Sequence, residues 1–209
     1  MQYYLLLFVL FVGTRYLANY FFHDIYLAYI ITIMVSGFAL MIFWREFPEL
    51  KFKFDWTAIL VGIGVCILWI ALEGHYPWFS FLGTPGEGFN PHKVANLLFI
   101  PAILFRLVGS LLVAPIIEEL FFRSFLYRFI ATKNWKHMKI GKYNTLAFFT
   151  TIIFFGFIHM RWLPGLIAGL GFTSLMIYRR NISSPILAHI TANLCLSLYV
   201  LSTQLWTFW

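Results

Sequence analysis

The chain has 209 residues, of which 61% are hydrophobic, 21% aromatic and only 11% charged, whereas soluble domains are about 25% charged. This composition excludes a water-soluble protein. The formal net charge is +7, but Lys and Arg in membrane proteins gather in cytoplasmic loops, where they contact anionic lipid headgroups. We therefore expect membrane lipids and no nucleic acid as partners, and the oligomeric state stays open.

Apolar segments recur along the whole chain, each near the length of about 20 residues that crosses a bilayer as a helix. They predict a single all-α membrane domain, residues 1–209, folded as a polytopic helical bundle of about seven transmembrane helices. The expected spans are about 3–22, 25–44, 55–73, 93–116 continuing to about 130, 144–160, 164–178 and 184–205. Within the sixth span, Gly165, Gly169 and Gly171 predict close packing against another helix.

The cations predict the orientation. With this number of spans, the loops that carry them fall on one side, which places the N-terminus in the cytoplasm of what we expect to be a bacterial or archaeal cell membrane. The opposite loop, 74–92, is rich in Gly, Pro and aromatic residues, and suits an ordered interfacial cap, a substrate lid or an anchor. The basic loops contain Arg45, Lys51, Lys53, Arg128, Lys133, Lys136, Lys139, Lys142, Arg179 and Arg180.

Most carboxylates, Asp55 and Glu49 among them, fall in or beside loops that water or headgroups can reach, but Glu118 and Glu119 lie inside an apolar helix. A charge there costs from a few kcal/mol upward and needs partners. Arg123 shares a helix face with Glu119, while Glu118 is turned about 100° away. One carboxylate can thus be anchored while its neighbour reacts, although a pair that only fixes helix packing gives the same pattern.

Pro115, just upstream, lacks a backbone donor and is expected to kink the helix and open a wet niche.

Two further spans carry polar side chains at helical spacing. His159 follows Phe155 by four residues, and Asn193 follows His189 by four, so each pair lies on one helix face. A membrane histidine alone often serves only as a hydrogen-bonding group between helices. The combination of these residues with the carboxylates points instead to a reaction site.

Arg15, Arg106 and Glu73 are also in or near apolar segments and stay outside this set; Glu73 is a possible partner for either arginine.

On these residues the sequence resembles the CPBP family of intramembrane proteases, which includes CAAX-processing endopeptidases of the Rce1 type. The family motif E-E-x-x-x-R appears at 118–123, F-x-x-x-H at 155–159 and H-x-x-x-N at 189–193, in family order. The resemblance covers residues 95–205 as a catalytic core, with residues 1–94 forming N-terminal helices and the outer loop. The stretches 69–73 and 88–91 are similar to CAAX-protease-related proteins found beside bacterial exosortase systems.

The resemblance implies an intramembrane endopeptidase that hydrolyses a peptide bond in a membrane-associated or lipidated substrate. It implies Glu118 as the base that activates water, Glu119 and Arg123 as its support, and His159, His189 and Asn193 as the rest of the site. As an uncharged donor, Asn193 could stabilise the developing oxyanion. A site without a cofactor is favoured, but zinc bound by Glu118, His159 and His189 is an open alternative.

Two other functions remain possible for the same polar residues. The first is a non-catalytic scaffold or immunity protein of the same family, and the second is a small transporter in which these groups titrate.

The position of His159 across the membrane is difficult to reconcile with one site that also contains His189. If the fifth span starts near 144, His159 lies near its outer end, whereas His189 lies only about a turn and a half into the seventh. We therefore expect residues 132–148 to form an amphipathic or protruding segment that lets His159 sit deeper. The two imidazoles must then lie within about 12 Å of each other, since one water has to serve both.

Overall fold

The computed structural model describes residues 2–82 and 86–209, and these are helical with no β-strand. One continuous helix, Phe99–Ala131, consists of α4 (Phe99–Val108), α5 (Ala114–Glu119) and α6 (Tyr127–Ala131), joined by π-helical turns at Gly109–Val113 and Leu120–Leu126. The other α-helices are α1 (Gln2–Phe22), α2 (Ile25–Phe43), α3 (Trp56–Ala71), α7 (Thr145–Phe157), α8 (Trp162–Arg179) and α9 (Ser183–Thr203).

The all-α polytopic bundle is confirmed, with a helix at each expected span. In the described part of the chain, four helices are long and apolar enough to cross a membrane: α1, α2 extended to Glu46, the long helix and α9. Helices α3 and α7 are apolar but shorter.

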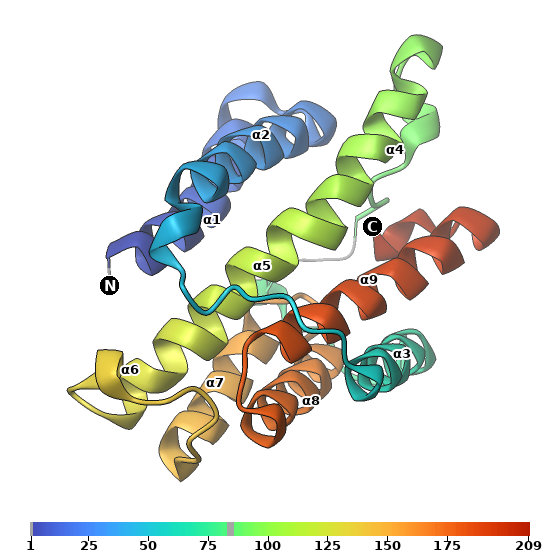
Figure 1. The fold of residues 1–209 in the computed structure, drawn as a ribbon. Helices are drawn as coiled ribbons and strands as arrows, with labels where there is room; N and C mark the ends of the chain where they lie inside the picture. The colour runs from blue at the N-terminus through green and yellow to red at the C-terminus, as the bar shows by residue number, and fades with distance from the viewer. Residues whose placement is uncertain (1, 83–85) are drawn as a thin grey trace.

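The long helix runs diagonally through the molecule, as Figure 1 shows, with the α1–α2 hairpin on one side and α3, α7, α8 and α9 on the other. Ile117 and Leu120 face the first group and pack in a core with residues of α1 and α2. Phe122 packs in a second core with Phe155 and Phe172. Residues 114–126 are therefore enclosed from two sides, which is the setting that a buried polar site requires.

Helix α8 packs tightly on α7 through glycine. A Cβ at Gly165 would lie 3.0 Å from the Gly156 carbonyl oxygen, and one at Gly169 would lie 3.2 Å from the Ile152 carbonyl oxygen. The close helix contact expected from these glycines is confirmed, and it fixes the turn between the two helices, where His159 lies.

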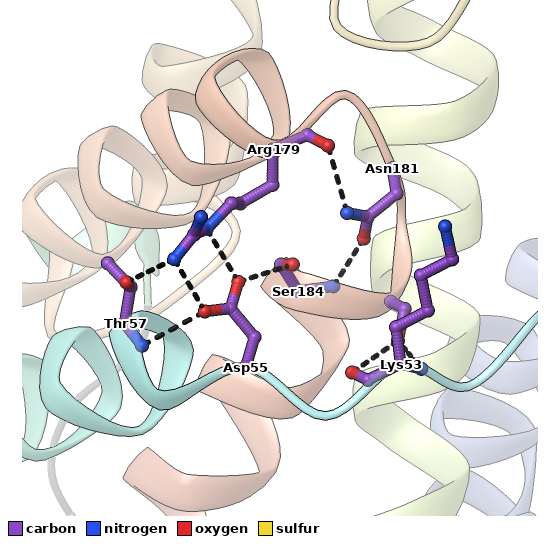
Figure 2. Close-up of polar contacts among 7 residues, drawn as sticks. Lys53, Asp55, Thr57, Arg179, Asn181 and Ser184 are labelled. Atoms are coloured by element: carbon purple, nitrogen blue, oxygen red, sulfur yellow. Dashed lines mark hydrogen bonds and ion pairs between the residues drawn. The ribbon is translucent and has the colours of Figure 1, made fainter.

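The basic loops lie at one end of the bundle. Figure 2 shows Asp55 capping α3 and accepting hydrogen bonds from Arg179 Nη2 at 2.9 Å and Ser184 Oγ at 2.8 Å. The Lys53 N–H donates to Ser183 Oγ at 2.7 Å. The loop before α3 is thereby tied to the turn between α8 and α9.

Two carboxylates in these loops are less accessible than expected. Glu49 accepts hydrogen bonds from Tyr4 and Ser124 and lies 3.5 Å from Arg128 Nη2. Asp55 is only 9% exposed. Both carboxylates lie in loops as expected, but each is largely buried because it accepts hydrogen bonds that join a loop to a helix.

The outer loop packs against the bundle where it is described. The Trp162 Nε1–H donates to the Pro77 carbonyl at 2.8 Å, and the Phe89 N–H donates to the Trp209 carbonyl at 3.1 Å. Phe89 is buried. The expected ordered cap agrees with these contacts, although residues 83–85 of the loop lie outside the described part.

Candidate active site

The two glutamates lie on α5, between the two π-helical turns of the long helix. The Ala114 N–H binds the carbonyl of Gly109, and the Tyr127 N–H binds that of Phe122, so each turn closes over five residues instead of four. Such π-turns are rare and are frequently found at functional sites. They change the direction in which the intervening side chains point relative to the flanking α-helical segments.

Pro115 explains a contact between the long helix and α9. Because the helix has shifted to the π-register at Gly109, the Ser110 carbonyl would be bound by the N–H of residue 115, which proline lacks. Asn193 Nδ2 donates to that carbonyl at 2.7 Å instead. Pro115 thus disturbs the helix by leaving the Ser110 carbonyl free to accept. This carbonyl then fixes the Asn193 carboxamide.

Glu119 is the anchored carboxylate. It is fully buried and accepts at its Oε1 from Arg123 Nη1 at 3.0 Å and from His189 Nδ1 at 3.0 Å. A carboxylate can only accept, so the His189 Nδ1 carries its proton and its Nε2 is turned away from Glu119. The ring of Phe172 stacks on this imidazole, with centroids 5.0 Å apart.

Glu118 is the free carboxylate. It is 8% exposed, and its Oε2 has no hydrogen-bond partner among the described residues. The nearest cationic or basic group is His159 Nε2, 4.0 Å away. His159 Nδ1 lies 2.7 Å from the Phe155 carbonyl, which can only accept, so Nδ1 carries the proton and Nε2 presents a lone pair toward Glu118.

His159 reaches the site because α7 is short. The helix has 13 residues and ends at Phe157, so its length of about 20 Å is well below the thickness of a bilayer core. The His159 and His189 rings lie 4.8 and 6.0 Å from the Phe155 ring, which places the two imidazoles within the required 12 Å.

The segment before α7 differs in part from the prediction. Residues 132–144 form a 3₁₀ turn and loops, as a non-spanning segment requires, but α7 begins at Thr145, inside the range that was expected to stand apart. Trp135 of this segment is buried in the first core. The depth of His159 therefore follows from the early end of α7.

A cavity of about 270 Å³ joins these groups. Glu118, His159, His189 and Asn193 line it, while Glu119 and Arg123 are fully buried. No three His, Cys, Asp or Glu side chains in the described part of the chain are grouped to hold a metal ion. His189 binds Glu119 through Nδ1, which leaves its Nε2 unengaged, so the zinc alternative stays open.

Some contacts of the site have no sequence signal at helical spacing. The Trp69 ring lies 5.8 Å from that of His159, and the Ser110 carbonyl holds Asn193. Glu73 binds Arg161 through two hydrogen bonds of 2.7 Å, so the prediction that it pairs with Arg15 or Arg106 is wrong. Arg161 lies directly before α8, in the turn that follows α7, and there it meets Glu73, which follows the end of α3.

Residues 100–195 match the family model for the type II CAAX prenyl endopeptidase Rce1-like family. Over these residues the chain resembles the Rce1-like domain, which supports its assignment to the CPBP protease family. The matched residues include Glu118, Glu119, Arg123, His159, His189 and Asn193, whereas α1, α2 and α3 lie outside them. No curated protein and no solved structure matches the chain. The matched family is one of prenyl endopeptidases, which supports a membrane-embedded protease that acts on a membrane-associated substrate.

Proposed function

We propose that this protein is an intramembrane endopeptidase that cleaves a membrane-associated or lipidated peptide, with Glu118 as the base that activates water. The observation that carries the proposal is the contrast between two adjacent carboxylates. Glu119 is fully buried and bound by Arg123 and His189, whereas Glu118 lines the cavity and forms no hydrogen bond with a described residue.

The distance of 4.0 Å between Glu118 Oε2 and His159 Nε2 is too long for a direct hydrogen bond and suits a bridging water. Both atoms are acceptors, so such a water donates one hydrogen to each. Its oxygen lone pairs are then directed into the cavity, toward the carbonyl carbon of a bound peptide. This arrangement orients the nucleophile before proton transfer begins.

As the water oxygen attacks, its proton passes to Glu118, and the carbonyl oxygen of the substrate becomes an oxyanion. Asn193 has a second N–H that is not used by Ser110, and it can donate to this oxyanion. Glu118 then returns the proton to the leaving nitrogen as the C–N bond breaks. The products are a carboxylic acid and an amine, and no covalent enzyme intermediate is needed.

The zinc alternative is tested by metal removal. We expect purified protein to keep full activity after chelation and dialysis into metal-free buffer, because each step assigned above uses a side chain. Activity that disappears on chelation and returns with added zinc would support the metallopeptidase instead.

The scaffold alternative is tested with reconstituted protein. Wild type in proteoliposomes is incubated with a mixture of lipidated and unlipidated peptides, and cleavage products are identified by mass spectrometry. We expect products from wild type and from Glu46→Gln, which removes an exposed carboxylate, and none from Glu118→Gln. Wild-type protein that binds peptides without cleaving any would favour the scaffold.

We further propose the cell membrane of a bacterium or archaeon as the location, with the N-terminus in the cytoplasm. The contacts between Asp55 and Arg179 and between Glu49 and Arg128 support this, because they gather the basic loops at one end. Accessibility of single cysteines introduced at Lys51 and Lys93 to an impermeant thiol reagent tests it. Reaction of the cysteine at position 51 from outside intact cells would contradict it.

A further inference from the structure

Arg106 lies at the far end of the cavity that contains Glu118. It belongs to α4, about three turns before Glu118 on the same long helix, and both side chains line the cavity of about 270 Å³. The family motifs do not include this residue, and the mechanism above does not use it.

The Arg106 guanidinium has no anionic partner. No carboxylate of the described residues, which contain every Asp and Glu of the chain, lies within 4.0 Å of it. Its Nε is buried without a hydrogen-bond partner. A charged group in an apolar setting normally has a counter-charge or a function.

Aromatic rings surround this cation and hold it in place. Its guanidinium carbon lies 4.8 Å from the centroid of the Tyr29 ring, 5.7 Å from Phe89 and 5.8 Å from Trp209. The Tyr29 hydroxyl donates to the Arg106 carbonyl at 3.2 Å. The Trp209 Nε1–H is also buried and has no hydrogen-bond acceptor among the described residues. It is a second donor beside Arg106 that a ligand can bind.

The charge around Arg106 is net positive. A second cavity, of about 630 Å³, also touches Arg106 and is lined by Arg15, Lys93, Arg161 and one carboxylate, Glu87. Lys93 is paired with Glu87, and Arg161 with Glu73. Arg15 donates only to the Ile25 carbonyl, at 3.3 Å. Arg15 and Arg106 therefore form no ion pair with a described residue, and both line the second cavity.

We propose that Arg106, assisted by Arg15, binds a carboxylate of the peptide substrate and so sets the distance between that carboxylate and the cleaved bond. The inference rests on the proposed function, because it takes Glu118 as the point of cleavage. The planar guanidinium can bind both oxygens of a carboxylate, and the bond is strengthened in a cavity of low dielectric constant.

The geometry limits the length of the substrate segment. Arg106 and Glu118 are separated by about 18 Å along the helix axis. An extended peptide covers at most about 3.3–3.6 Å per residue, so about five extended residues span this distance between the carboxylate and the cleaved bond. The free C-terminus of a peptide or an acidic side chain can supply it.

The test measures binding apart from cleavage. Glu118→Gln protein in detergent is titrated with three fluorescent apolar pentapeptides: one with a free C-terminal carboxylate, one with a C-terminal amide, and one amide with a penultimate Glu. We expect at least about tenfold tighter binding of one or both carboxylate peptides than of the plain amide. The two carboxylate arms distinguish a terminal from a side-chain source.

Adding Arg106→Gln should remove this preference while plain-amide binding persists, which shows that the protein is folded. Arg106→Lys should keep part of it, and Arg45→Gln, at the opposite end, should keep all of it. Equal binding of all three peptides, or a preference that survives Arg106→Gln, would overturn the inference. Competition by phosphatidylglycerol vesicles alone, with no carboxylate preference, would also overturn it and point to a lipid phosphate.

Failure of the proposed function has a different result. In that case wild type cleaves none of the peptides, yet the carboxylate preference of the Glu118→Gln protein is still observed.

Discussion

The guanidinium carbon of Arg123 lies 4.0 Å from the ring centroid of Phe155, a contact that joins two of the three short motifs. Arg123 is fully buried, and the same Phe155 ring also borders both imidazoles of the site. Phe155 is therefore the side chain around which the cation and the two histidines are packed. The packing of these three side chains therefore requires an aromatic ring at this position, four residues before His159.

We expect Phe155→Leu to lower the free energy of unfolding by about 2 kcal/mol, through loss of a desolvated cation–π contact and of packing. Activity should fall further than stability alone explains, because both histidines lose a common support. Thermal unfolding in detergent and peptide cleavage measure the two effects. Phe149→Leu, on an exposed position of the same helix, should change neither, and equal losses in both variants would contradict this role.

Removing only one member of the buried Glu119–Arg123 pair should be costly. Arg123→Gln leaves a fully buried carboxylate without its cation, for which we expect a loss of about 3–5 kcal/mol. The double variant Glu119→Gln, Arg123→Gln should recover much of this stability and none of the activity, since His189 loses its charged acceptor. A double variant whose loss equals the sum of the losses of the two single variants would show that the pair is not coupled.

The Asn193 contact should depend on Pro115. In wild type, Asn193→Leu leaves the Ser110 carbonyl without a donor, at a cost of about 1–3 kcal/mol. Pro115→Ala restores a backbone N–H near that carbonyl, so Asn193→Leu should cost less in the Pro115→Ala background. Chemical denaturation of the four proteins gives the coupling energy. Strictly additive effects would exclude the link between the two residues.

Asp55 should make stability depend on pH. Burial raises the pKa of this carboxyl, but hydrogen bonds from Ser184, Thr57 and Arg179, with the charge of Arg179, outweigh burial and hold the pKa below its ordinary value. Its stabilising effect is thus complete above about pH 4 and is lost as the pH falls through the folded-state pKa.

The melting temperature of Asp55→Asn, compared with wild type, checks this relation. The difference between the two should be largest near neutral pH and shrink in acid, whereas Glu46→Gln should show no such trend. A difference that is constant down to the lowest pH at which the protein folds would refute the assignment.

The sequence predicted contacts within helices well, because residues four apart share a face: Glu119 with Arg123 is the clearest case. It could not predict contacts between helices, which depend on helix length and tilt. The Glu73–Arg161 pair forms because α3 and α7 both end early. The π-turns also escaped prediction, since a proline indicates a disturbed helix without specifying that its register shifts.

The unequal roles of the adjacent glutamates were predicted from the angle of about 100° between them. Which one faces a cavity depends on what surrounds the helix, and here Glu118 does so while Glu119 is enclosed. The position of Arg106 beside the same cavity could not be inferred, because the aromatic rings around it come from distant segments such as α2 and the outer loop.

The most direct test of the central claim compares Glu118→Gln with Glu119→Gln in one cleavage assay and one thermal unfolding experiment. If Glu118 is the base, Glu118→Gln should reduce cleavage by about 10²–10⁴-fold or more and leave the melting temperature near that of wild type. Glu119→Gln should instead lower the melting temperature, because Arg123 loses its only carboxylate partner. A Glu118→Gln protein that cleaves peptides at the wild-type rate would contradict the account.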